Sequence, residues 1–263
     1  MPHAGPMTFL SIRYAIVITL MTLLALAMGA PWPKRAQIVP IAIAGLFVHA
    51  GYLGGVFSSI SLGVEAGVSA LVAGLQPVVT AALAGPFLGE KVTGRQWAGL
   101  ALGVLGVVLV IHTKLGLGLG TPVGMGLSAF AMLSLTIGTL WQKRYCAGMD
   151  LRTGSVVQFI ASLAVTAPLA FFIEGFRVEW APNFIIAMAW LCIVLSICTI
   201  SAMFVLIRRG KAAEVASLFF LVPPTTAIIA WFMFGERVEA LSMVGMALVI
   251  AAVAMVTWKP RGA

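Results

Sequence analysis

Long runs of apolar residues alternate with short polar stretches along the whole chain. Nine of these runs approach the length of about 20 residues that a helix needs to cross the hydrocarbon core of a bilayer. None alternates with a period of two, as a membrane β-barrel would, so the pattern predicts an all-α polytopic membrane protein. The predicted spans are 8–28, 37–60, 64–87, 95–112, 122–142, 153–173, 183–206, 212–234 and 240–258.

One long passage of the sequence occurs twice. Residues 63–110 match residues 210–256 after a shift of about 146 positions. Each copy consists of two apolar helices joined by a Gly-Glu-basic turn, and duplicated membrane units of this kind are common in secondary transporters. The coinciding positions are Pro77 with Pro223, Gly89 with Gly235, Glu90 with Glu236, Val92 with Val238 and Gly99 with Gly245.

The repeat divides the chain into a first unit, residues 1–113, with four helices and a second unit, residues 122–258, with five. Span 122–142 opens the second unit and has no counterpart in the first. The opening span also resembles a signal peptide, because Arg13 precedes an apolar run that ends in small residues. The repeat pairs this span with the equally apolar segment 154–174, so we interpret it as a retained helix.

The composition excludes a soluble protein. Hydrophobic residues make up 61% of the chain and charged residues 9%, whereas soluble domains carry roughly 25% charged residues. The net charge of +8 reflects basic residues in the loops, so it indicates membrane topology and not a nucleic-acid partner. The three cysteines show no CxxC spacing and predict neither a disulfide framework nor a metal site.

The basic residues concentrate in alternate loops, which predicts a cytoplasmic C-terminus. This orientation places the Glu90 turn inside and the Glu236 turn outside, so the two units are inverted relative to each other. The inside loops carry Lys34, Arg35, Lys91, Arg95, Lys143, Arg144, Arg152, Arg208, Arg209, Lys211, Lys259 and Arg261, and the outside loops carry Lys114, Arg177 and Arg237.

No enzyme signature is present in the sequence. It contains no zinc-ligand spacing, no GxSxG and no Walker loop. We therefore predict no catalytic residues, no metal and no cofactor, and we expect any transport to be driven by a gradient or an exchange partner.

Six polar or aromatic residues within or at the ends of the spans are candidates for a substrate pathway, because polar groups at membrane depth usually face the bundle interior. His49 and Tyr52 lie three residues apart and share a face of an α-helix. Packing hydrogen bonds or interface anchoring are the alternative roles. The full set is Arg13, His49, Tyr52, Gln76, Trp141 and Gln158.

Three prolines predict helix breaks in the repeated segment. Pro77 deprives the carbonyl of Ala73 of its helical partner, and Pro223 and Pro224 do the same in the second copy. Freed carbonyls beside a cavity can bind a substrate or form a hinge; a plain kink is the alternative. The glycine pairs Gly51 with Gly55 and Gly99 with Gly103 predict close helix packing.

The two copies resemble the EamA type of the drug/metabolite transporter superfamily. The resemblance lies in LQPVVTAALAGPFLGEKVTGRQWAGLALGVLGVVLV, residues 75–110, and LVPPTTAIIAWFMFGERVEALSMVGMALVIAAVAMV, residues 221–256. The opening PMTFLSIRYA, residues 6–15, is similar to the second helix of such proteins. The family fold implies ten helices in two inverted five-helix units, so this chain is expected to lack the first helix.

The resemblance implies a secondary transporter that moves small organic metabolites or drugs across a bacterial plasma membrane by alternating access, with export favoured. Its partners would be a small-molecule substrate and the lipid bilayer, with a homodimer or another chain supplying the missing helix. A partner-dependent or non-transporting remnant of such a transporter is the alternative reading. A membrane-embedded enzyme is a third, which would need clustered carboxylates or histidines.

Overall fold

The described part of the protein is built from helices, with one isolated bridge between Ala4 and Val178. The computed structural model describes residues 3–112, 120–192, 212–222, 224–225, 228 and 239–257. The helices are α1 (Pro6–Ala27), α2 (Arg35–Gly45), the π-helical turn η1 (Leu46–Gly51), α3 (Tyr52–Ser61), α4 (Ala66–Gly74), α5 (Gln76–Leu88), α6 (Gly94–Ile111), α7 (Pro122–Tyr145), α8 (Leu151–Glu174), α9 (Pro182–Trp190), α11 (Ala212–Ser217), the 3₁₀ turn η4 (Leu218–Leu221) and α13 (Ala240–Thr257).

Seven helical stretches among the described residues are long and apolar enough to cross a membrane. They correspond to the first six predicted spans and to the last, so the prediction of an all-α polytopic membrane protein is confirmed. The predicted spans 183–206 and 212–234 are described only in part, as α9 and α11 with η4. Pro223 and the turn at residues 235–236 lie outside the described residues.

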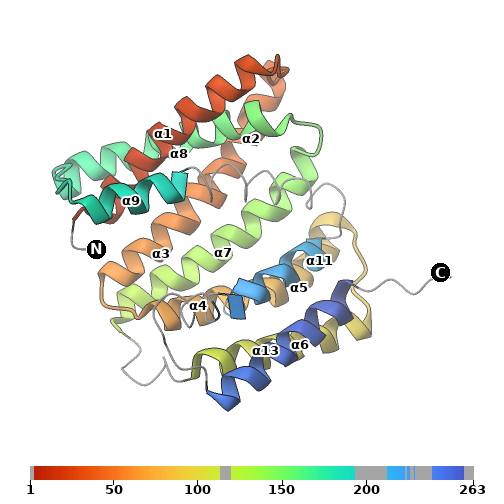
Figure 1. Ribbon diagram of the computed structural model, residues 1–263. Helices are drawn as coiled ribbons and strands as arrows, with labels where there is room; N and C mark the ends of the chain where they lie inside the picture. Colours follow the sequence, from red (N-terminus) through yellow and green to blue (C-terminus); the bar gives the residue numbers. More distant parts are fainter. Residues whose placement is uncertain are drawn as a thin grey trace.

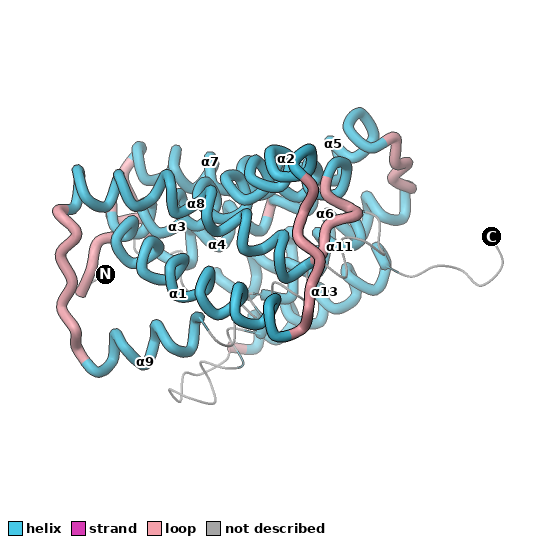
Figure 2. Tube along the Cα trace, turned by 90° about the horizontal axis from the view of Figure 1, so that it is seen from above, coloured by secondary structure: helices cyan, strands magenta, loops and turns pink. Residues whose placement is uncertain are grey.

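Two pairs of long helices lie on opposite sides of the bundle (Figure 1). α1 packs along α8 on one side, α6 packs along α13 on the other, and α3 and α7 run between them. In the perpendicular view the N-terminus and the connection from α8 to α9 lie at the same edge (Figure 2). α7, which has no counterpart in the first unit, packs against α2, η1, α3, α4 and α5.

The helices of each pair run antiparallel. Near the start of α8, the Thr153 hydroxyl donates to the Pro31 carbonyl just beyond the end of α1, over 2.7 Å. Gln96 near the start of α6 donates to the carbonyl of Val256 near the end of α13, over 3.4 Å. α13 begins and ends 146 residues after α6, so the two helices are corresponding parts of the repeat. Their antiparallel packing is the arrangement expected for two units related by a two-fold axis in the membrane plane.

Glu174, the last residue of α8, holds the beginning of α1. Its carboxylate accepts hydrogen bonds from the backbone N–H of Met7 at 2.9 Å and of Thr8 at 2.7 Å, and from the Thr8 hydroxyl at 2.7 Å. The first N–H groups of a helix have no partner within the helix, and a carboxylate there also interacts favourably with the helix dipole. The two membrane-spanning helices are therefore joined at this end by charge-assisted bonds.

Glycines allow the backbones of α6 and α13, and those of α3 and α7, to approach each other closely. A Cβ added at Gly106 would lie 2.8 Å from the Gly245 carbonyl oxygen of α13, and one at Gly99 would lie 3.1 Å from the Ala252 carbonyl oxygen. Gly55 meets Ala131 of α7 in the same way. Small residues at helix contacts are how membrane helices gain van der Waals packing, and the predicted close packing at the Gly99 and Gly55 faces is confirmed.

We expect Gly106→Ala and Gly126→Ala to change stability in opposite directions. At Gly106 the new methyl group collides with backbone atoms of α13, so the variant should lose about 1–3 kcal/mol of stability. A Cβ at Gly126 of α7 meets nothing within 4 Å, so alanine should stabilise this helix by about 0.5–1 kcal/mol. Thermal unfolding of the purified variants in one detergent checks this, and equal midpoints would contradict the close approach.

Candidate functional site

The span Arg35–Ser61 is not a regular α-helix. A π-helical turn, Leu46–Gly51, separates α2 from α3 and has His49 near its middle. A π turn inside a longer helix is rare and occurs frequently at functional sites, because its i to i+5 bonding leaves some backbone groups less well paired. Sequence analysis did not predict this turn.

Side chains from three other helices bind carbonyl groups of this span. The Tyr14 hydroxyl of α1 donates to the His49 carbonyl at 2.9 Å, Ser134 of α7 to Phe47 at 3.0 Å, and Ser162 of α8 to Gly45 at 3.0 Å. An unpaired backbone group in the hydrocarbon region costs several kcal/mol, so irregular backbone there must be satisfied by protein. These donors let the π turn exist at membrane depth.

The His49 side chain is buried against aromatic and amide groups. Its ring stacks on Phe159 of α8 with centroids 4.2 Å apart, and Tyr14 packs beside it at 6.2 Å. The Gln158 side chain lies next to the imidazole. The Nε2 atom of His49 is buried without a hydrogen-bond partner. This nitrogen and the adjacent Gln158 side chain are therefore the polar groups at the centre of the span.

Gln158 connects this cluster to α7. Its Nε2 donates to Oε1 of Gln142 at 3.1 Å, while its own Oε1 is buried without a partner. Gly45 permits this arrangement, because a Cβ there would lie 2.5 Å from the Gln158 carbonyl oxygen. α2 and α8 thus cross at the point where Gln158 enters the protein interior.

Gln76 lies at a break between two helices. α4 ends at Gly74 and α5 begins at Gln76, with Pro77 as its second residue. Leu75 therefore separates the two helices, two residues before Pro77. Gln76 Nε2 donates to the Thr80 hydroxyl at 2.9 Å, and its Oε1 is buried without a partner.

The second copy of the repeat is also irregular at the same position. Its helix α11 passes into the 3₁₀ turn η4, which ends at Leu221, and Leu221 corresponds to Leu75 of the first copy. Pro224, just after this turn, is buried. Paired discontinuous helices in corresponding positions of two units are the feature that marks the substrate region in many transporters.

The remaining predicted residues differ in their surroundings. Trp141 donates from its indole nitrogen to the Pro40 carbonyl at 3.0 Å, which favours an anchoring role between α7 and α2. Arg13 is buried inside the protein, and its backbone carbonyl lies 4.0 Å from the Cys192 sulfur. Tyr52 is half-buried at the start of α3. The expectation that Tyr52 shares a face with His49 assumed α-helical geometry, which the π turn alters.

The structure brings His49 and Gln158 together, and no contact among the described residues joins Gln76 to either. Their joint lining of one cavity stays a prediction. Sequence reasoning missed Tyr14, Phe159 and Gln142, which complete the cluster. A signal for part of it was available: polar residues follow one face of α8 at spacings of three and four. These residues are Ser155, Gln158, Ser162 and Thr166.

A family profile described as the EamA-like transporter family matches residues 1–112 and 122–258. The chain belongs to this family. The two matched segments flank the stretch between α6 and α7, so the EamA-like sequence pattern occurs twice in the protein.

Relatives of this EamA-like chain are named as transporters. The uncharacterized inner membrane transporter YedA of Escherichia coli (strain K12) is 23% identical over 96% of this chain and 81% of its own length. A probable amino-acid metabolite efflux pump of Salmonella typhimurium is 24% identical over 95% of this chain and 84% of its own length. A probable terminal-alkyne amino-acid exporter of Streptantibioticus cattleyicolor is 24% identical over 95% and 83%.

A solved crystal structure shares the fold of this EamA-like chain. The two superpose with a TM-score of 0.82 over 97% of this chain and 89% of the other, at 19% sequence identity. At that identity the likeness concerns the fold. It supports the arrangement of helices described above.

We expect Tyr14→Phe to destabilise the protein by about 0.5–1.5 kcal/mol, because it removes the side-chain donor to the buried His49 carbonyl, which keeps the backbone N–H of Tyr52. The matched control is Tyr145→Phe, since Tyr145 is exposed at the end of α7 and should change stability by less than about 0.5 kcal/mol. Thermal unfolding in detergent gives the comparison. If both variants unfold at the wild-type temperature, the Tyr14 hydroxyl does not hold the π turn.

Proposed function

We propose that this EamA-like protein exports small amino-acid-related metabolites across the bacterial inner membrane by alternating access. The names of two relatives, an amino-acid metabolite efflux pump and an amino-acid exporter, support both the direction and the class of substrate. The inner membrane location draws support from YedA. The family is one of transporters, and neither the profile nor these names points to an enzyme.

Three unpaired atoms in the span interiors supply the structural support. His49 Nε2, Gln76 Oε1 and Gln158 Oε1 are each buried without a hydrogen-bond partner. A buried polar atom without a partner costs about 1–3 kcal/mol, and most native proteins keep such atoms few. A polar solute that donates to these atoms in passing would recover that cost. We therefore assign His49, Gln158 and Gln76 to the pathway, with Arg13 and Tyr52 as further candidates.

Alternating access would use the irregular helices. The π turn at residues 46–51, the break at Leu75 and the 3₁₀ turn at residues 218–221 interrupt helical bonding in three spans. Interruptions of this kind let one part of a span tilt without unfolding the rest. The two units, residues 1–113 and 122–258, would rock about these points.

We expect His49→Ala and Gln158→Leu to lower the initial rate of export at least about fivefold for any amino-acid derivative that the wild type moves. Removing one hydrogen-bonding partner is worth about 1 kcal/mol or more, which corresponds to this factor. The measurement is efflux from cells or proteoliposomes loaded with a panel of labelled amino acids and their derivatives.

Tyr145→Phe and Lys34→Gln serve as matched controls, because both parent residues are exposed in the described structure. They should transport at the wild-type rate. Unchanged rates for His49→Ala and Gln158→Leu, in protein that remains folded, would show that these residues only pack the bundle.

The basic residues predict that the C-terminus faces the cytoplasm. A reporter that fluoresces only in the cytoplasm, fused after Gly262, should therefore be bright. The same reporter fused after Trp180, in the connection between α8 and α9, should be dark because that connection is predicted to lie outside. Fluorescence from the second fusion in a well-expressed protein would reverse the assigned orientation.

A further inference from the structure

We propose that a phospholipid with a zwitterionic head group binds at the membrane surface where α1 begins, with an acyl chain in the groove between α3, α7 and α8. Two neighbouring hollows in the protein surface support this proposal. One is charged and lies at the end of the helices, and the other is apolar and lies within the membrane-spanning region. They are lined by consecutive or nearby residues of the same three helices, α1, α3 and α8.

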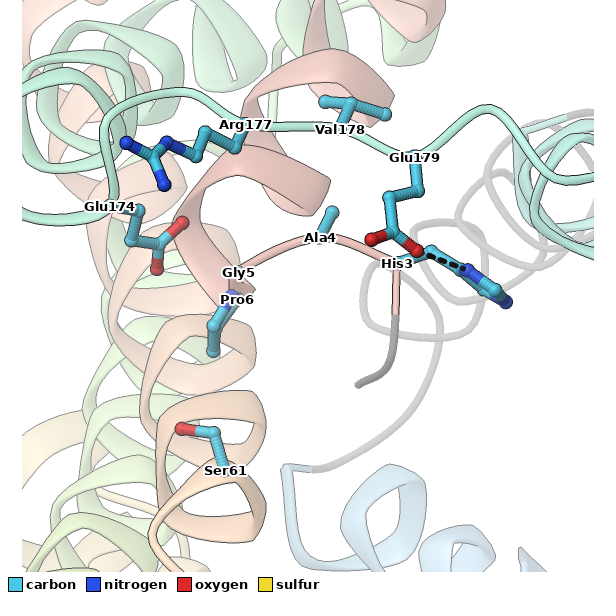
Figure 3. Close-up of a pocket in the computed structure, with 9 residues that line it drawn as sticks. All are labelled: His3, Ala4, Gly5, Pro6, Ser61, Glu174, Arg177, Val178 and Glu179. Carbon is cyan, nitrogen blue, oxygen red and sulfur yellow. Dashed lines mark hydrogen bonds and ion pairs between the residues drawn. The ribbon is translucent and has the colours of Figure 1, made fainter.

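The charged hollow has a volume of about 570 Å³. Figure 3 shows Arg177 and Glu179 on either side of Val178 in the connection after α8, next to the first turn of α1 and to Ser61 at the end of α3. The Glu174 carboxylate already accepts hydrogen bonds from the N–H groups of α1. Oε2 of Glu179 lies 3.4 Å from Nδ1 of His3. The Arg177 side chain is exposed and forms no ion pair among the described residues.

The apolar hollow has a volume of about 410 Å³ and is open to the side of the bundle. Gly54 and Gly55 line it along α3, while Phe130, Val165 and Leu169 form a rim that is 52%, 43% and 38% exposed. These rim residues belong to the outward faces of α7 and α8. The groove therefore opens toward lipid.

The depth of the groove matches one leaflet. Leu46 lines its inner end and Ser58 its outer end, three residues before Ser61 of the charged hollow. At 1.5 Å per residue the twelve residues from Leu46 to Ser58 span about 18 Å, close to half of the 30 Å hydrocarbon core. In the orientation assigned above, this is the outer leaflet.

The width of the groove favours an acyl chain over a helix of a second copy. A volume of 410 Å³ over that depth gives a mean cross-section of about 23 Å², which is roughly 5 Å across. A helix with side chains is about 10–12 Å across and would lie over the groove without filling it. A hydrocarbon chain fits within it.

The side chains of the charged hollow favour a zwitterionic head group. Arg177 can bind a phosphate through two N–H groups, and the Glu179 carboxylate, which lies beside His3 on the other side of Val178, can accept a hydrogen bond from an ammonium group. The side chains of Glu174, Arg177 and Glu179 sum to one negative charge. This excess negative charge would repel a purely anionic head group. Phosphatidylethanolamine carries both a phosphate for Arg177 and an ammonium group for Glu179.

Native mass spectrometry of the detergent-purified full chain tests the site, using dioleoyl phosphatidylethanolamine and dioleoyl phosphatidylglycerol as probes. Wild type should retain one phosphatidylethanolamine and bind it at least about fivefold more tightly than phosphatidylglycerol. Arg177→Gln should weaken phosphatidylethanolamine about tenfold, and Ala50→Phe should weaken both lipids because the ring fills the groove. Leu169→Trp, which enlarges an already exposed side chain, repeats the groove test if Ala50→Phe does not fold.

The matched controls are Lys34→Gln, an exposed cation before α2, and Ala247→Phe, an exposed alanine on α13. Both should bind lipid as the wild type does. Wild-type binding by Arg177→Gln, or by both folded groove variants, would overturn the proposal. So would a dimer of the 27.6 kDa chain that Leu169→Trp dissociates, because the groove would then be an interface between two copies.

Discussion

The requirement that every backbone carbonyl within a membrane find a partner inside the protein governs this structure. Where the span Arg35–Ser61 departs from α-helical bonding, the carbonyls of Gly45, Phe47 and His49 accept hydrogen bonds from side chains of α8, α7 and α1. Water is not available at that depth, so the irregular turn and its donors must be present together. The helices around the span are consequently positioned by the backbone that they satisfy, and the aromatic and amide cluster at His49 forms as a result.

Hydrogen bonds from α8 likewise satisfy backbone groups at the two ends of α1. Glu174 supplies the acceptor for the first N–H groups of α1, and Thr153 supplies a donor for the carbonyl beyond its last turn. α1 is thus fixed at both ends by α8, the helix that corresponds to it in the repeat. On the other side, α6 and α13 obtain their contact from glycines, because tight van der Waals packing replaces the hydrophobic effect between helices in lipid.

In contrast to these hydrogen-bonded groups, one side-chain atom of each of His49, Gln76 and Gln158 is buried without a hydrogen-bond partner. They lie on different helices, each near a place where helical structure is interrupted or two helices cross closely. A protein whose described residues leave only these three buried side-chain atoms without a partner has the chemistry for a solute that binds weakly and moves on. Strong, fully paired sites would hold a substrate and slow its release, which is unfavourable for a carrier.

The sequence by itself determined the all-α membrane class and the repeat, because these follow from hydrophobic run length and self-similarity. It also identified Gly99 and Gly55 as packing faces. It did not determine the π turn, since an i to i+5 turn has no compositional signature distinct from the α-helix around it. Nor could it place Tyr14 or Phe159 against His49 or assign Glu174 to α1. Those contacts depend on the rotation and crossing of helices far apart in the chain, which only tertiary packing decides.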